Sequence, residues 1–377
     1  MEENRRYTVG CIIGTRPEAI KMAPVFFQLQ TCAWANVVFI NTAQHREILD
    51  EMLEVFGLVP DHDLNIMTTQ QSLGELTALL CNSLDKLVKE HHFDILLAVG
   101  DTTTVFTSSL IAFYNKIPFG HIEAGLRTLN MDEPFPEEMN RTLTASLATW
   151  HFVPTSLEKE NLLRENITAS KITITGNPVI DALYWILQKN PQKREPRLSN
   201  IIVVTAHRRE NIGKNLTNIC SAIIALSQQF THINFVFPIH PNPQIQHHIQ
   251  SMLFNKPRIH LLPPLKYDEF ANLLQDCFFV LTDSGGIQEE APALGKPVLV
   301  LRNMTERPAI ITEGLGLLVG TEKENIIYAT SELITNKKMY SEMARGISPY
   351  GDGQAAKRIV ETLQTYLVTA QAPYLKE

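Results

Sequence analysis

The sequence predicts an α/β protein built from two Rossmann-like domains, and three observations support this fold. The chain has 377 residues, a length that suits two domains at roughly 150 residues each. Short apolar runs alternate with longer stretches of helical character, which is typical of βαβ units. The same alternation then starts again in the second half of the chain, after a polar segment at 189–200.

The predicted strands of the first half are apolar throughout, whereas half-exposed strands alternate apolar and polar residues. Continuous Val- and Ile-rich runs are typical of parallel strands that are buried on both faces. These strands are residues 7–13, 36–41, 94–99, 117–122 and 151–153, and the helices between them are 17–30, 46–56, 73–90, 105–114 and 136–149.

The second half repeats this pattern beyond a linker-like segment, KNPQKREPRLSN, which is charged and contains two prolines. We expect one domain at 1–173, joined by a C-terminal helix within 354–377, and a second domain at 174–353. The predicted strands are 201–205, 234–237, 259–262, 278–282 and 298–301, and the predicted helices are 216–228, 243–253, 268–275, 286–294, 325–335 and 354–367.

Composition excludes several classes of protein. The net charge of −7 disfavours general nucleic-acid binding. The five cysteines form no CxxC pair, so neither a zinc ribbon nor a disulfide framework is expected. No stretch approaches the roughly 18 apolar residues of a membrane span, and the apolar run near the start is too short for a signal peptide. We therefore expect a cytoplasmic protein that has no membrane partner.

Polar and ionisable residues follow the predicted strands directly. Because ligands of open parallel sheets bind beyond the carboxyl ends of the strands, these residues are expected to form the site. The segments concerned are GTRPE at 14–18, QHRE at 44–47, GDTTT at 100–104, HIEAGLR at 121–127, AHRREN at 206–211 and DSGG at 283–286.

The segment DSGGIQEE at 283–290 predicts an anion site at the start of a helix. Ser284 can cap the helix, and Gly285 and Gly286 let a phosphate approach its unpaired N–H groups. The Glu290 carboxylate could accept two hydrogen bonds from a ribose diol. A plain capped helix is the structural alternative, and neither GxGxxG nor a P-loop is present.

An acidic protein that binds a diphosphate must gather positive charge locally. The candidate cations are Arg16, Lys21, His207, Arg208 and Arg209, although each arginine taken singly could form a surface ion pair. His207 is the best candidate to contact a departing phosphate, because a cationic imidazole can both pair with it and donate a proton.

Three carboxylates of the first half, Asp101, Glu123 and Glu137, are candidates for acid/base chemistry. Glu137 could instead stabilise the start of a helix through the helix dipole. No HExxH or His/Cys spacing typical of a metal site occurs, so no metal is predicted.

Eight blocks of the sequence resemble the non-hydrolysing bacterial UDP-N-acetylglucosamine 2-epimerases. They run in order over nearly the whole chain: GTRPEAIKMAP at 14–24, AQHRE at 43–47, GDTTT at 100–104, HIEAGLRT at 121–128, PFPEEMNR at 134–141, TAHRREN at 205–211, DSGGIQEEAPALGKPVLVLR at 283–302 and TERP at 305–308.

The resemblance implies a GT-B fold, in which two Rossmann-like domains face a central cleft, and a homodimer without cofactor or metal. It implies reversible epimerisation at C2 of UDP-GlcNAc to UDP-ManNAc, through elimination of UDP to 2-acetamidoglucal and re-addition, for surface polysaccharide synthesis. Its implied catalytic residues are Asp101, Glu123, Glu137 and His207, and its implied substrate contacts are Arg16, Lys21, Arg141, His207, Ser284, Gly285, Gly286, Glu290 and Arg307.

The sequence departs from the family pattern at two places near the sugar side. Residues 129–133 read LNMDE where many members carry Gly-Asn-x-Tyr-Ser, and Ala309 follows TERP where many carry Glu. Many members also bind substrate at a second, activating site. The residues at corresponding positions here are Gln44, Glu47, Gln70, Arg209 and His240.

Several alternatives remain open at this stage. A hydrolysing epimerase would release ManNAc and UDP, and a related enzyme would act on a diacetamido-glucuronic acid. A GT-B glycosyltransferase would share the UDP site but would not need the three carboxylates. A UDP-sugar sensor would bind ligand without any exchange at C2.

Overall fold

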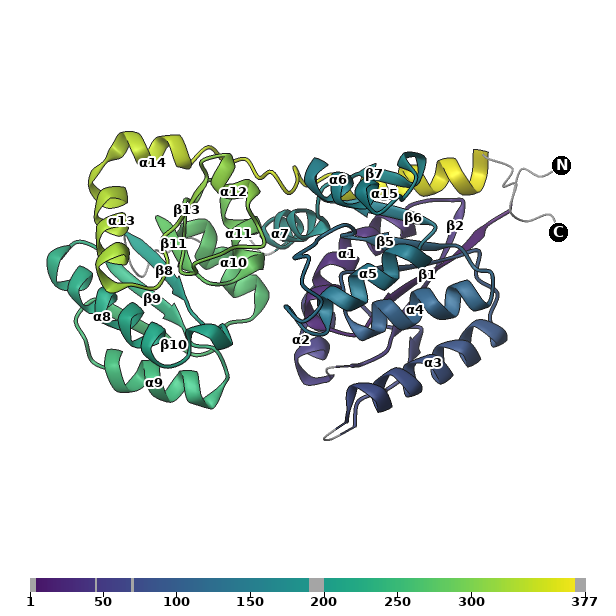
Figure 1. Cartoon of the computed structure of the whole chain (residues 1–377), viewed down its shortest axis with the longest axis horizontal. Helices are drawn as coiled ribbons and strands as arrows, with labels where there is room; N and C mark the ends of the chain where they lie inside the picture. Colours follow the sequence, from purple (N-terminus) through teal and green to yellow (C-terminus); the bar gives the residue numbers. More distant parts are fainter. Residues whose placement is uncertain (1–4, 45, 69–70, 190–199, 370–377) are drawn as a thin grey trace. The chain divides into compact units, whose positions relative to one another are not determined.

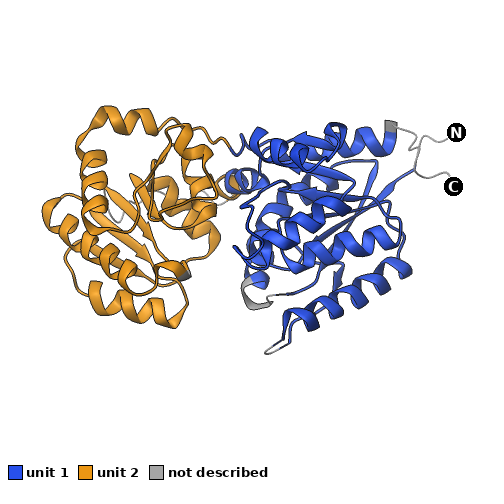
Figure 2. Ribbon diagram, in the orientation of Figure 1, with its two compact units in different colours: residues 1–185, 350–377 blue, residues 186–349 orange. Residues whose placement is uncertain are grey.

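The computed structural model describes residues 5–44, 46–68, 71–189 and 200–369, and the chain divides into two compact units (Figure 2). Unit 1 comprises Met1–Trp185 and Tyr350–Glu377, and unit 2 comprises Ile186–Pro349. The first division falls inside α7 (Pro178–Lys189), later than the boundary expected after residue 173. Most of the linker-like segment at 189–200 lies outside the described residues.

Unit 1 contains a sheet whose described strands are all parallel, in the order β3-β2-β1-β4-β5-β6-β7. Every residue of β4 is buried, which explains why its sequence is apolar throughout. The strands are β1 (Tyr7–Ile13), β2 (Ala35–Asn41), β3 (His62–Asp63), β4 (Ile95–Val99), β5 (Phe119–Ile122), β6 (Trp150–Val153) and β7 (Ile172–Ile174).

The helices of unit 1 pack in two groups (Figure 1): α3, α4 and α5 lie side by side, and α1 packs against α2 and α15. Right-handed crossovers in a sheet of this order place the two groups on opposite faces. The helices are α1 (Arg16–Gln30), α2 (Arg46–Phe56), α3 (Leu73–Glu90), α4 (Thr103–Tyr114), α5 (Glu137–Leu147), α6 (Ser156–Arg164), α7 and α15 (Ala355–Gln364), with a 3₁₀ turn at Ala169–Lys171 and a π-helical end at Thr365–Thr369.

The start of α3 shows how local sequence fixes a helix boundary. The Ser72 hydroxyl accepts a hydrogen bond from the Glu75 N–H at 3.2 Å, and the Glu75 carboxylate accepts one from the Ser72 N–H at 2.9 Å. This capping box satisfies two N–H groups that would otherwise lack a helical partner. The helix therefore begins at Leu73, as predicted.

Unit 2 repeats the strand order of unit 1 as β10-β9-β8-β11-β12-β13, again with parallel pairing throughout. Its apolar core centres on residues such as Ile202, Phe235 and Phe279. The elements are β8 (Ile201–Thr205), α8 (Lys214–Gln229), β9 (Asn234–Pro238), α9 (Pro243–Leu253), β10 (Ile259–Leu262), α10 (Tyr267–Asp276), β11 (Phe279–Thr282), α11 (Gly285–Ala293), β12 (Val298–Val300), α12 (Ala309–Thr312), β13 (Gly316–Leu318), α13 (Lys323–Thr335) and α14 (Lys337–Met343), with a 3₁₀ turn at Arg209–Asn211.

Both strand orders are those of a Rossmann-like sheet, so the predicted fold class is confirmed. In each sheet the direction of successive connections reverses once, between β1 and β4 in unit 1 and between β8 and β11 in unit 2. At such a switch point the loops on either side diverge and leave room for a ligand at the carboxyl ends of the strands.

Candidate active site

Arg16, Asp101 and Glu123 all lie at the carboxyl edge of the sheet in unit 1. Arg16 is exposed at the first position of α1, Asp101 follows β4, and Glu123 follows β5. Since β1, β4 and β5 are adjacent and parallel, the topology gathers these three residues at one edge. Arg16 and Asp101 lie at the switch point between β1 and β4, and Glu123 lies one strand further along the same edge.

Glu123 is a buried carboxylate held by two donors from distant parts of the chain. Its Oε2 lies 2.5 Å from Lys21 Nζ, and its Oε1 accepts a hydrogen bond from Asn177 Nδ2 at 2.9 Å. Its backbone φ is 62°, in the left-handed region that residues other than glycine rarely adopt. Such strain persists only where surrounding contacts enforce it, and it is concentrated at functional sites.

Asp101 is half-buried and paired with Arg141, whose NH2 group lies 2.5 Å from Asp101 Oδ2. Arg141 NH1 also donates to the buried Glu138 Oε2 at 3.1 Å. The other Glu138 oxygen accepts from the backbone N–H groups of Thr128 and Leu129, both at 3.0 Å. Arg141, predicted as a substrate contact, is thus buried between two carboxylates and orients Asp101.

Glu137, the third predicted carboxylate, is half-buried at the first position of α5. A carboxylate at this position is stabilised by the N–H groups and dipole of the helix end. The next residue in the chain, Glu138, belongs to the Asp101–Arg141 cluster. Glu137 and Glu138 therefore both lie at the start of α5, whereas Asp101 lies in the loop after β4.

Glu18 organises this edge of the sheet, although the sequence analysis did not select it. Its Oε2 accepts hydrogen bonds from the N–H groups of Gly14 at 2.6 Å and Thr15 at 2.8 Å, and its Oε1 accepts one from the Thr102 hydroxyl. The carboxylate therefore ties the loop after β1 to the loop after β4. The sequence signal was the Thr15-x-x-Glu18 spacing of a capping box.

Burial raises the pKa of Glu18 to about 7, although its hydrogen bonds oppose that shift. Between pH 4.5 and 7 the folded state then keeps a proton that the unfolded state has lost, so this residue costs stability as pH rises. The cost reaches about 3 kcal/mol above pH 7.

We expect Glu18→Gln to be more stable than the wild type at pH 8, with the difference vanishing towards pH 4.5. Urea titrations followed by tryptophan fluorescence report unit 1, because Trp34, Trp150 and Trp185 all belong to it. Burial lowers the pKa of His121 to about 4 and that of His151 to about 3, so both also make stability depend on pH. Their contribution is the same in the two proteins and cancels when the stabilities are compared at each pH. A difference in stability that does not change with pH would contradict this prediction.

His207 lies at the carboxyl edge of the unit 2 sheet, two residues beyond β8. Its Nδ1 is 3.3 Å from Oδ1 of Asp283, a fully buried residue that follows the adjacent strand β11. The imidazole also stacks on that of His240, with ring centroids 5.1 Å apart and planes at 8°. His240, predicted for a second substrate site, is thus a direct neighbour of His207.

Two arginine side chains lie beside the start of α11, where the sequence predicts an anion site. Ser284 is the N-cap residue, and its side chain makes no capping hydrogen bond. A Cβ placed on Gly285 would meet Arg208 NH2 at 3.6 Å and Arg307 NH2 at 3.8 Å, whereas one on Gly286 would meet no atom within 4 Å. Two guanidinium groups therefore border a helix end that is open at its second glycine.

Three carboxylates of unit 2 fix the groups around α11. The Arg307 Nε donates to the buried Glu289 Oε1, and the Tyr267 hydroxyl donates to Glu290 Oε1 at 2.7 Å. The Glu306 Oε2 atom lies 3.8 Å from Arg307 NH1 and 3.9 Å from Arg208 NH2. Glu290, predicted to bind a ribose diol, is buried and oriented by Tyr267.

The remaining candidates for a second substrate site are only partly described. Gln44 is half-buried, and its Oε1 accepts a hydrogen bond from the Thr104 hydroxyl at 3.0 Å. Gln70 and the side chains of Glu47 and Arg209 lie outside the described part of the structure.

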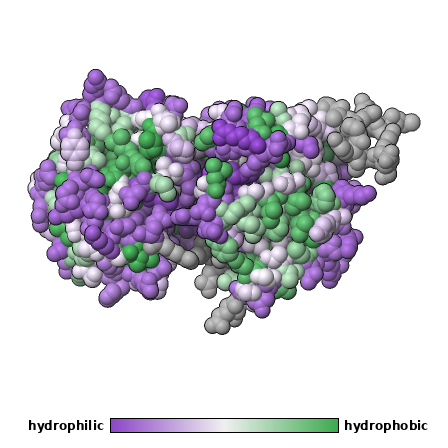
Figure 3. Space-filling model, viewed as in Figure 1, coloured by the Kyte–Doolittle hydropathy of each residue, from purple (hydrophilic) through white to green (hydrophobic). Residues whose placement is uncertain are grey.

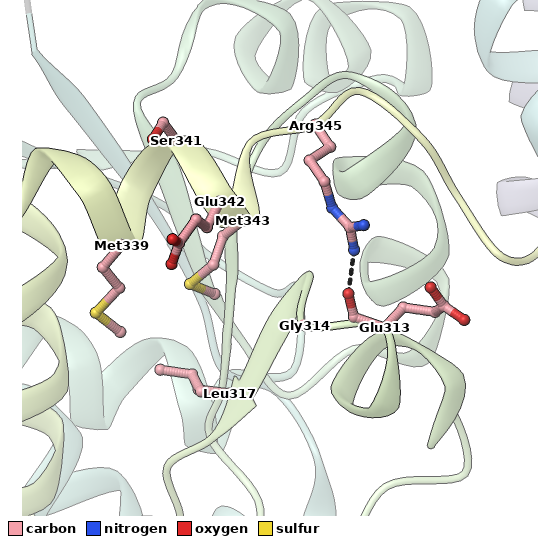
Figure 4. Close-up of a pocket in the computed structure, with 8 residues that line it drawn as sticks. All are labelled: Glu313, Gly314, Leu317, Met339, Ser341, Glu342, Met343 and Arg345. Atoms are coloured by element: carbon pink, nitrogen blue, oxygen red, sulfur yellow. Dashed lines mark hydrogen bonds between the residues drawn. The ribbon is translucent and has the colours of Figure 1, made fainter.

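A cavity of about 510 Å³ in unit 2 lies away from the predicted site residues (Figure 4). It is bordered by α14 and the turn before β13, and the Arg345 guanidinium donates to the Glu313 carbonyl at its rim. Its lining combines apolar and charged side chains: Glu313, Gly314, Leu317, Met339, Ser341, Glu342, Met343 and Arg345. None of the predicted site residues borders it.

Among the described residues, no group of three or more His, Cys, Asp or Glu side chains could hold a metal ion. Every helix in the described ranges is too short or too polar to cross a lipid bilayer.

Comparison with known proteins matches the chain to one family. The family model for UDP-N-acetylglucosamine 2-epimerase matches residues 28–364. The UDP-N-acetylglucosamine 2-epimerase of Escherichia coli K12 is 45% identical over 365 residues, which cover 94% of this chain and 97% of the relative.

Solved structures give the same result for the fold. The crystal structure of UDP-GlcNAc 2-epimerase from Neisseria meningitidis bound to UDP-GlcNAc is 47% identical, with a TM-score of 0.89 over 95% of this chain and 100% of that one. The Methanocaldococcus jannaschii enzyme in complex with UDP-GlcNAc and UDP is 33% identical, with a TM-score of 0.81 over 95% of this chain and 99% of that one. The resemblance predicted from the sequence blocks, including the GT-B-like α/β fold, is confirmed, and the chain belongs to the UDP-N-acetylglucosamine 2-epimerase family.

Proposed function

We propose that this protein interconverts UDP-GlcNAc and UDP-ManNAc by inverting C2 of the sugar, without net hydrolysis. The observation that carries this proposal is the pair of carboxylates Asp101 and Glu123, each oriented by a cation at the carboxyl edge of one sheet. A glycosyltransferase that uses UDP-sugars has no need for such a pair. Solved relatives in complex with UDP-GlcNAc support the choice of substrate.

Direct removal of the C2 proton would leave an unstable carbanion, because C2 is not next to a carbonyl group. Elimination avoids this intermediate. A base takes the C2 proton, the C–H electron pair forms a C1–C2 double bond, and the C1–O bond breaks so that its electrons leave with UDP. UDP then adds back to C1 of the 2-acetamidoglucal while a proton returns to the opposite face of C2. The reaction therefore needs an acid/base group on each face of the ring.

In this proposal the acid/base groups are residues of unit 1, and most of the proposed nucleotide contacts are residues of unit 2. Asp101, Glu123 and Glu137 serve C2 and the C3 hydroxyl. Lys21 places a positive charge 2.5 Å from Glu123 Oε2 and orients that carboxylate. Arg16, exposed at the start of α1, is a further contact for the diphosphate.

The diphosphate is assigned to the open end of α11, with Ser284, Gly285 and Gly286 as backbone contacts. His207, Arg208 and Arg307 supply positive charge at this end of unit 2. These groups stabilise the negative charge that develops on the departing UDP. Glu290, which Tyr267 orients by a hydrogen bond to Oε1, is assigned as the acceptor for the ribose hydroxyls.

Incubation with UDP-GlcNAc in deuterated water, followed by NMR, tests the proposed reaction. We expect UDP-ManNAc that carries deuterium at C2, and deuterium also in the recovered UDP-GlcNAc. Free ManNAc with UDP would favour a hydrolysing epimerase. Ligand binding without any exchange at C2 would contradict an epimerase and favour a sensor, and an acceptor requirement would favour a transferase.

Three finer properties belong to the same proposal. We propose a cytoplasmic enzyme that supplies ManNAc units for surface polysaccharide, and a homodimer.

Apolar side chains gather over the part of unit 1 where α3 and α4 lie (Figure 3). The exposed apolar residues of these helices and of α5 include Leu79, Phe113, Tyr114 and Leu143. Light scattering that gives the mass of one chain would overturn the dimer.

Activation by UDP-GlcNAc at a second site is proposed for the residues around Gln44 and His240. The stacking of His240 on His207 supports a link between such a site and the catalytic residues. Hyperbolic kinetics with UDP-ManNAc that need no added UDP-GlcNAc would show that activation is absent.

A further inference from the structure

Asp283 is a fully buried carboxylate that binds the loop carrying His207. Its Oδ2 accepts three hydrogen bonds: from the N–H groups of His207 at 2.8 Å and Arg208 at 2.9 Å, and from Asn211 Nδ2 at 2.9 Å. These donors are more than 70 residues away in the chain, so the contact is purely tertiary. One carboxylate oxygen thus sets the path of the backbone on which His207 stands.

The second oxygen of Asp283 has a different role. Oδ1 is buried and accepts no aligned hydrogen bond from any described residue, yet it lies 3.3 Å from His207 Nδ1. A buried carboxylate oxygen without a donor is costly, and a small rotation of the imidazole would bring an Nδ1–H into line with it. Catalytic hydrogen bonds that are poorly aligned in a free enzyme commonly tighten when ligand binds.

We propose that Asp283 is a positioning residue for His207: Oδ2 fixes the loop, and Oδ1 accepts a hydrogen bond from Nδ1–H of the imidazole. This bond selects the tautomer in which Nε2 is the nitrogen that gains and loses the proton. The carboxylate also stabilises the imidazolium form, which is the form that can pair with an anion and donate to it.

The other charged groups around His207 make such a partner necessary. His240 stacks on His207 from the loop after β9, so a proton on either ring disfavours a proton on the other. Arg208 follows His207 in the same loop, and it borders Gly285 together with Arg307. Against these cations stand Asp283 and, beside the two arginines, Glu306. Asp283 lies within ion-pair distance of the His207 ring, and its charge favours a proton on that ring.

This inference rests on the proposed function only where it assigns His207 to the departing diphosphate. The pairing itself is independent of any substrate. It is tested by the titration of the His207 imidazole in the free enzyme, so failure of the pairing and failure of the proposed reaction give different results.

The test compares Asp283→Asn with Asn211→Ala, and reads the His207 imidazole by NMR as a function of pH. The chain has 12 histidines, and the His207 signal is identified by its loss in His207→Gln. In Asp283→Asn the amide oxygen can keep the three donors of the loop, while the amide NH2 faces Nδ1 and cannot accept from it. We expect the pKa of His207 to fall by about one unit or more.

Asn211→Ala is the matched control, because it removes one donor to Oδ2 and leaves Oδ1 in place. We expect it to leave the pKa of His207 unchanged. With UDP-GlcNAc as substrate, Asp283→Asn should lower kcat on the order of a hundredfold or more while KM changes much less, as loss of a general acid does.

Two outcomes would overturn the proposal. One is an Asp283→Asn protein whose His207 titrates as in the wild type, and the other is an equal shift in Asn211→Ala, which would indicate loosening of the loop alone. Should Asp283→Asn fail to fold, the wild type still decides the question. The proposal requires the neutral His207 ring to carry its proton on Nδ1, which nitrogen NMR shifts report, and a proton on Nε2 instead would contradict it.

Discussion

Glu123→Gln is expected to lower the turnover number by about 10²- to 10⁴-fold, the range typical of a lost acid/base group, while UDP binding stays close to that of the wild type. Glutamine preserves the shape of this buried side chain and can still accept from Asn177 Nδ2. It cannot take a proton from C2. Exchange of deuterium into C2 measures the loss directly, and calorimetry with UDP measures the retained affinity.

The ion pair with Lys21 requires a matched control, because Glu123→Gln also removes the partner of that lysine. Lys21→Met removes the cation and leaves the carboxylate. We expect it to weaken UDP binding and also to lower exchange at C2 at saturating substrate, because Glu123 loses the cation that orients it, whereas Glu123→Gln should lower exchange alone. Asp101→Asn and Glu137→Gln should follow the pattern of Glu123→Gln. A variant with full activity would remove its residue from the mechanism.

The ordinary strands and helices could be predicted from the sequence because they are long enough to show a pattern. Residues 201–205 and 259–262 are apolar runs bounded by turns, and 73–90 carries both helical spacing and a capping box. Elements of a few residues were missed, since two to four residues show no period. These are β3, β7, β13 and α12; the longer α6, α7 and α14 were also missed.

The positions of the site residues could be predicted, but their partners could not. The rule that ligands bind beyond the carboxyl ends of parallel strands selected Asp101, Glu123 and His207 from their places in the chain. The pair of Lys21 with Glu123 joins residues 102 apart, and Asn177 is 54 residues from Glu123. Such contacts depend on the strand order and on helix packing, which the pattern of one sequence does not specify.

The strained backbone of Glu123 was also beyond sequence reasoning. A φ of 62° is common for glycine and uncommon for glutamate, so the residues HIEAG give no indication of it. The structure shows that Lys21 and Asn177 hold the carboxylate from two sides. These two contacts hold a glutamate in a strained conformation that residues other than glycine rarely adopt. Because such strain is concentrated at functional sites, this is an argument for function that comes from the structure alone.

Arg141→Met is expected to destabilise unit 1 by about 3 kcal/mol, near the lower end of the cost of breaking a buried ion pair. The Arg141 side chain is 9% exposed, and it lies between Asp101 and a Glu138 side chain that is only 2% exposed. Removing the guanidinium leaves the Glu138 charge buried. Its two backbone donors, from Thr128 and Leu129, compensate in part and keep the loss near that lower end.

Urea unfolding followed by tryptophan fluorescence measures this loss in unit 1, where all three tryptophans lie. Lys89→Met is the matched control: it breaks the Lys89–Asp85 pair on α3, whose side chains are 65% and 35% exposed, and should cost less than about 1 kcal/mol. Adding Glu138→Gln to Arg141→Met should restore part of the stability, because the buried charge is then gone. A loss below about 1 kcal/mol in Arg141→Met would mean that Glu138 is satisfied without its arginine, and that Arg141 is retained for contact with substrate instead of for orienting Asp101.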